Sequence, residues 1–85
     1  MKLEYIKSIK ANDDYSLQVI FEDGLEGSVD IKPYLADEAF GCLNDIHEFK
    51  KIHNGGYFVE WLCGADLSAD TLRYKIEKNK VQTVK

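Results

Sequence analysis

The chain has 85 residues, enough for one hydrophobic core, and it predicts a single domain over residues 1–85. Apolar residues make up 45% and charged residues 31% of the sequence, a balance that argues against disorder. The formal net charge of −4 argues against nucleic-acid binding over a broad face, because phosphate contacts need clustered Lys and Arg.

The N-terminus and the cysteines predict a cytoplasmic protein. Lys2, Glu4 and Lys7 interrupt the region where a signal peptide needs apolar residues, and no apolar run could span a bilayer. A secreted domain this small usually carries several disulfides, whereas this chain has only Cys42 and Cys63. One bridge between them is geometrically possible, but we favour two buried free thiols.

In chain order, the first elements are strands with one face in the core. Apolar residues recur at every second position from residue 15 to 21, and the same period continues from residue 25 to 31. A three-residue turn keeps both apolar sets on one face, since it pairs Leu17 with Val29 and places Gly24 in the left-handed conformation. A two-residue turn would instead place the apolar residues of the second strand on the opposite face of the sheet.

The preceding strand is expected to join this pair into a meander. A three-residue loop at residues 12–14 would set Ile9 opposite Leu17. On the other face it would set Ile6 opposite Ile20, so we expect that face to be partly covered.

The middle of the chain is less regular. Residues 31–35 suit a short helical turn with Pro33 near its start, and residues 37–41 are expected to form a loop. Asn44 is placed to cap a short helix over residues 45–48.

Residues 49–53 and 57–62 are expected to form a second hairpin around Asn54-Gly55-Gly56. A three-residue loop would pair Ile52 with Phe58, and a two-residue loop at Asn54-Gly55 is an open alternative.

The last element is a helix that Ser68 caps, reached through a connection at residues 63–67. Leu72 and Ile76 lie four residues apart on one helical face, and residues 81–85 are either a short strand or a frayed end. The predicted class is α+β: an antiparallel sheet from a three-stranded N-terminal meander plus a second hairpin, with a short middle helix and a C-terminal helix.

Two ordered motifs, Phe21-x-Asp-Gly-x-x-Gly-x-Val-Asp30 and Trp61-x-x-Gly-Ala-Asp-Leu67, lie within a wider match from about Ile6 to Leu72. On these residues the chain resembles the bacterial family catalogued as domain of unknown function 2442. The resemblance implies a small α+β domain with an antiparallel sheet and brings no established activity. Some members append a helix-turn-helix domain, and others are encoded beside a small protein, which implies antitoxin-like pairing.

Cys42, His47, His53 and Cys63 are the soft ligands that zinc prefers. They lack a Cys-x-x-Cys spacing and fall on separate predicted elements, so we expect no metal and no cofactor. A Cys–His nucleophile pair meets the same difficulty, and no glycine-rich turn offers an oxyanion hole. The chain is therefore not expected to be an enzyme.

Asp23, Asp30 and Asp66 stand out through the family resemblance. Turn chemistry explains Asp23, and the other two lie at element boundaries, where a carboxylate accepts backbone N–H bonds. Structural roles are therefore favoured over catalysis.

Candidate partner contacts are aromatic or basic: Trp61, Tyr57, Arg73, Lys75 and Lys78. Trp61 falls on the same face of its predicted strand as Tyr57 and Val59, so a core position is the default, and any of these aromatic residues left exposed would suit a partner contact. We expect a non-catalytic module that binds another small protein, with a homodimer as an alternative and no membrane contact. Two further alternatives are a nucleic-acid-associated regulatory subunit using the basic C-terminal helix, and a small metal protein or enzyme using the Cys/His set.

Overall fold

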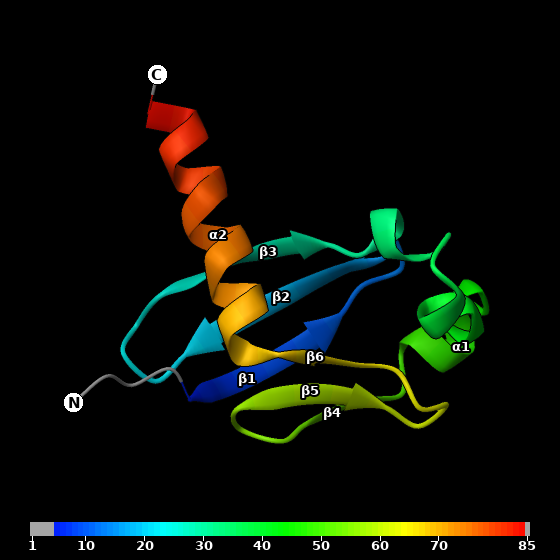
Figure 1. Ribbon diagram of the computed structural model, residues 1–85. Helices are drawn as coiled ribbons and strands as arrows, with labels where there is room; N and C mark the ends of the chain where they lie inside the picture. Colours follow the sequence, from blue (N-terminus) through cyan, green and yellow to red (C-terminus); the bar gives the residue numbers. More distant parts are fainter. Residues whose placement is uncertain (1–4, 85) are drawn as a thin grey trace.

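The computed structural model describes residues 5–84 and contains two antiparallel three-stranded sheets (Figure 1). The first sheet, in the order β1-β2-β3, consists of β1 (Ile6–Ala11), β2 (Ser16–Phe21) and β3 (Glu26–Asp30). The second, in the order β4-β5-β6, consists of β4 (Ile52–Asn54), β5 (Phe58–Trp61) and β6 (Asp66–Ser68). The helices are the 3-10 helices η1 (Lys32–Tyr34) and η2 (Glu38–Asn44), and the α-helices α1 (Ile46–Phe49) and α2 (Ala69–Val84).

The α+β class is confirmed, but the second hairpin is part of a separate three-stranded sheet. Residues 66–68 form β6 and pair with β5, so the prediction of a plain connection there was wrong. The backbone N–H of Trp61 donates to the carbonyl of Ala65 at 2.8 Å, which closes the turn between these strands. The three-residue length of β6 left no alternation from which to predict it.

The predicted turn between β2 and β3 is confirmed. Leu17 faces Val29, and the N–H of Phe21 donates to the carbonyl of Leu25 at 2.8 Å. Gly24 has a φ of +96°, the left-handed region that glycine adopts at little cost.

The predicted register between β1 and β2 was wrong by two residues. Ile9 faces Val19 because the three-residue turn lies one residue later than expected, at residues 13–15: the N–H of Asn12 donates to the carbonyl of Ser16 at 2.9 Å, and Tyr15 has a φ of +67°. A register shift between Ile6 and Ser8 then turns Ile6 inward, opposite Phe21. The outer face of this sheet therefore lacks the apolar pair that was expected to be covered.

Neither predicted register for the second hairpin is correct. Ile52 faces Trp61, and the N–H of Gly55 donates to the carbonyl of Phe58, which leaves Gly56 and Tyr57 at the tip. The strand begins three residues later than expected, because the residues before it are used by α1 and the bend that follows.

The middle of the chain contains more helix than predicted. The turn η1 with Pro33 near its start is confirmed, but residues 38–44 form η2 rather than a loop. The cap of α1 is Asp45, whose carboxylate accepts the N–H of His47 at 2.9 Å. Asn44, the predicted cap, instead uses its amide to hold the end of η2, donating to the carbonyl of Gly41 at 3.1 Å.

Helix α2 lies across the first sheet, and its C-terminal end projects beyond it (Figure 1). The predicted cap is confirmed, since the Ser68 hydroxyl accepts the N–H of Thr71 at 3.1 Å. Leu72 and Ile76, expected on one apolar face of the helix, are both buried, and the core that they join includes residues of both sheets. The helix continues through residues 81–84, so the prediction of a strand or frayed end there was wrong, and Lys85 lies outside the described residues.

One hydrophobic core joins all these elements. Its largest fully buried side chains are Phe21, Phe49, Ile6, Leu17, Ile31, Leu43, Leu72 and Ile76. Within residues 5–84, no helix has the length and apolar character needed to cross a membrane.

Candidate functional site

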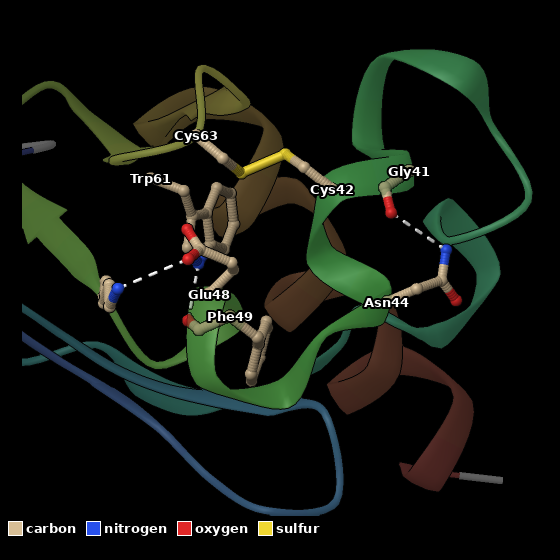
Figure 2. Close-up of a disulfide and its surroundings, with 8 residues drawn as sticks. Gly41, Cys42, Asn44, Glu48, Phe49, Trp61 and Cys63 are labelled. Atoms are coloured by element: carbon tan, nitrogen blue, oxygen red, sulfur yellow. Dashed lines mark hydrogen bonds and ion pairs between the residues drawn. A yellow bond between two sulfur atoms is a disulfide. The ribbon is translucent and has the colours of Figure 1, made fainter.

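A disulfide between Cys42 and Cys63 joins η2 to the turn between β5 and β6 (Figure 2). The preference for free thiols was therefore wrong. The two Cα atoms lie 6.3 Å apart because α1 packs on the second sheet and brings η2 beside that turn. Disulfides persist in oxidising compartments and are rare in the cytosol, so cysteine usage no longer supports a cytoplasmic location.

The bridge also removes the thiols that the metal and nucleophile hypotheses require. Both sulfur atoms are bonded to each other and offer no thiolate to a metal or to a neighbouring histidine. Among the residues that the structure describes, no group of three or more His, Cys, Asp or Glu side chains is arranged to hold a metal ion.

Trp61 lies beside the bridge and belongs to the core (Figure 2). Its side chain is only 2% exposed, its Nε1 donates to the carbonyl of Phe49 at 2.7 Å, and its ring stacks on that of Phe49. The default core assignment is confirmed, and Trp61 cannot serve as a broad contact surface.

Tyr57 lies at the tip of the β4–β5 hairpin and is 67% exposed. Its ring meets the half-exposed ring of Tyr5 edge-on, with centroids 5.1 Å apart. Of the two aromatic candidates, Tyr57 is therefore the one whose ring is available to a partner.

Arg73 is engaged within the molecule. Its guanidinium lies over the ring of Phe21, and its Nη2 donates to the carboxylate of Asp23 at 2.6 Å. The Arg73 hydrogen bond is the main cause of the lowered pKa of Asp23, and the N–H of Leu25 adds to it. This pair fastens the β2–β3 turn to α2.

Lys75 and Lys78 also lie over aromatic rings of their own molecule. The Nζ of Lys75 is 5.1 Å from the ring centre of Tyr34, and that of Lys78 is 5.9 Å from the ring centre of Tyr74. Together with the ion pair of Arg73, these contacts direct the three basic candidates toward three different neighbours rather than into one cluster.

The family-marked aspartates differ in role. Asp23 accepts the N–H of Leu25 at 3.1 Å, and Asp30 accepts that of Lys32 at 3.0 Å. Both bonds support the structural interpretation of these two residues. Asp66 is exposed on β6, where it is paired with Glu60 across the sheet.

The exposed face of the second sheet is the strongest candidate site. We call it the β5 face, and it consists of Phe58, Glu60 and Leu62 with His53 from β4 and Asp66 from β6. Tyr57 lies next to this face at the hairpin tip. Phe58 is 40% exposed and Leu62 is 79% exposed. The outer face of the first sheet differs, since its exposed side chains are polar: Ser8, Lys10, Gln18, Glu26, Ser28 and Asp30.

A shallow hollow of about 480 Å³ opens on the same face. The residues that line it include Trp61, the apolar Leu62, and the charged Lys51 and Glu60. Lys51 is itself paired with Glu48 at 3.2 Å. The β5 face therefore combines apolar area, a depression and charges at its centre.

Sequence reasoning missed Phe58, Glu60 and Leu62 as surface candidates. The signal was present in the strand alternation, because assigning Val59 and Trp61 to the core places Phe58 and Glu60 on the opposite face. The position of Gly56 and Tyr57 at the hairpin tip depends on the register between β4 and β5, for which the sequence left alternatives open.

These features define a small α+β domain with an exposed, partly apolar sheet face. The chain belongs to the family described as "Protein of unknown function (DUF2442)", whose model matches residues 6–78. No curated protein and no solved structure matches the chain.

Proposed function

We propose that this protein is a non-catalytic interaction module that binds another protein through the β5 face. The supporting observation is the presence of exposed large hydrophobic side chains there: Phe58 and Leu62 lie on the β5 face, and Tyr57 lies beside it at the hairpin tip. Exposed apolar patches are typical of protein contact surfaces, and aromatic side chains often supply much of the binding energy.

The other functions receive less support. The engaged Arg73, Lys75 and Lys78 weaken the case for nucleic-acid binding through α2. The disulfide weakens the case for Cys/His chemistry. The family resemblance favours a small protein encoded beside this one as the partner, as in antitoxin-like pairs.

Photo-crosslinking in the source cell tests the proposal. Leu62→p-benzoylphenylalanine places a reactive ketone on the β5 face, and Gln18→p-benzoylphenylalanine places it on the exposed face of the first sheet as a matched control. We expect a discrete adduct with a different protein from position 62 and none from position 18. Equal labelling from both positions, or no adduct from position 62, would refute the proposal. An adduct between two copies would replace the second protein with a homodimer.

A further inference from the structure

Two carboxylates lie directly opposite each other at the centre of the β5 face. Glu60 on β5 pairs in register with Asp66 on β6, and both side chains are exposed on the same side of the sheet. Like charges in directly opposite positions of an antiparallel pair repel each other and destabilise the sheet. The isolated domain therefore has an uncompensated local cost at this position.

The cations nearby do not neutralise this pair. Within residues 5–78, neither Glu60 nor Asp66 forms an ion pair, and the ammonium of Lys51 is bound to Glu48. His53 faces Glu60 from β4 as the third member of the row across the sheet. A cation that approached from outside would be attracted to both carboxylates at once.

Apolar side chains flank the carboxylates along the strand. Phe58 precedes Glu60 by two positions within β5, so both project to the same side. Leu62 lies just beyond the end of β5 and lines the same hollow as Glu60. A partner that covers these apolar groups removes water from the carboxylates and strengthens their attraction to a cation. The charge at the centre and the apolar area around it thus favour the same occupant.

We infer that the β5 face binds a segment of a partner protein in which a Lys or Arg side chain lies between two apolar side chains. The cation takes the position between Glu60 and Asp66, and the apolar groups cover Phe58 and Leu62. This inference rests on the proposed function and specifies the chemistry of its partner. A second copy is a poor occupant, because a twofold dimer through this face would bring two copies of the same acidic pair together.

Nuclear magnetic resonance titration of the ¹⁵N-labelled protein tests the inference. The probe is the blocked pentapeptide Leu-Ser-Arg-Ser-Leu, and the control peptide carries Glu in place of Arg. We expect the Arg peptide to shift the amide signals of β5 and β6 at millimolar concentration. Its dissociation constant should be roughly fivefold to tenfold lower than that of the Glu peptide, and the difference should shrink as salt is added.

Two variants test whether the carboxylates, rather than the apolar side chains, make the protein prefer the Arg peptide. The double variant Glu60→Gln/Asp66→Asn should bind both peptides equally, whereas Glu26→Gln, which removes one charge from the other sheet, should behave as the parent protein. Folding of each variant is checked by its amide spectrum. Position-62 adducts together with equal binding of the two peptides by the parent protein would overturn the basic partner while leaving the docking face in place. Absence of both adducts and peptide shifts would overturn the face itself.

Discussion

Side chains of Asp and Asn build many of the turns in this molecule. Each accepts the backbone N–H two residues further on, which stabilises a turn at that point. The pairs are Asp14 with Ser16, Asp23 with Leu25, Asp30 with Lys32, Asp37 with Ala39, Asp45 with His47 and Asn54 with Gly56. Much of the acidic excess between residues 13 and 45 therefore serves local structure, which explains why these carboxylates form no reactive cluster.

The ion pair of Asp23 with Arg73 leads to a prediction about pH. Its pKa is lowered in the folded state, first by the hydrogen bond from Arg73 and then by the N–H of Leu25. The folded state therefore binds a proton at this carboxylate less readily than the unfolded chain. This contribution to stability is complete above the unfolded value of about 4 and is lost as the pH falls through the lower folded value.

Carboxyl ¹³C titration in the parent protein and in Arg73→Gln measures this effect. We expect the Asp23 pKa to rise in the variant and yet to stay below its ordinary value, because the bond from Leu25 remains. An unchanged titration in Arg73→Gln would show that the ion pair does not hold the carboxylate.

The positions of the turns explain which strand registers were predictable. The β2–β3 turn was correct because apolar residues on both strands allow one register with an Asp-Gly corner. The prediction of the β1–β2 turn was wrong because Tyr15, an aromatic residue of a type common in strands, belongs to the turn and takes a left-handed conformation there. That conformation is accompanied by tertiary contacts, since the Tyr15 hydroxyl donates to the carbonyl of Asn44 and its ring packs on Phe49. Such distant partners have no local sequence signal.

The packing of α2 on β3 depends on a glycine. A Cβ at Gly27 would lie 2.7 Å from the Cγ2 of Ile76, well inside van der Waals contact. Gly27→Ala should therefore lower the free energy of unfolding by about 1–3 kcal/mol, measured by denaturant titration. Gly41→Ala is the matched control, because nothing lies within 4 Å of its Cβ position.

The same substitution made in a second variant tests whether the contact with Ile76 causes the loss of stability. Ile76→Ala removes the atoms that the new methyl group would meet, so Gly27→Ala should cost less in that variant than in the parent protein. An equal cost in both backgrounds would attribute the loss to the backbone of β3 instead.

At the scale of the whole molecule, the candidate site was only partly predictable. Tyr57, which the sequence suggested as a partner contact, is exposed, but the sequence also grouped Trp61 and the basic residues of α2 with it. Their engagement depends on how α1 and α2 dock onto the sheets, and no local pattern encodes it. The proximity of Cys42 and Cys63 has the same origin, which is why free thiols and a bridge both remained open.

The bridge should contribute measurably to stability. Cys42 and Cys63 are 21 residues apart, and the segment between them includes α1, β4 and β5. Closing a loop of this length restricts the unfolded chain by about 3 kcal/mol. We therefore expect Cys42→Ser/Cys63→Ser to lower the free energy of unfolding by about that amount, and a dithiol reductant to destabilise the parent protein but not the variant.

The variant should nevertheless keep the fold, because the core packs independently of the two sulfur atoms. Leu43, next to Cys42, is fully buried and still anchors η2, and the Trp61–Phe49 hydrogen bond still holds α1 on the second sheet. Near-ultraviolet circular dichroism of Trp61 should thus be preserved below the unfolding transition. Equal stability of the parent protein and the variant, with the bridge verified by mass spectrometry, would contradict the prediction. A stability difference would mean that a reducing compartment leaves the domain in its less stable dithiol form, with the β5–β6 turn beside Leu62 no longer tied to η2.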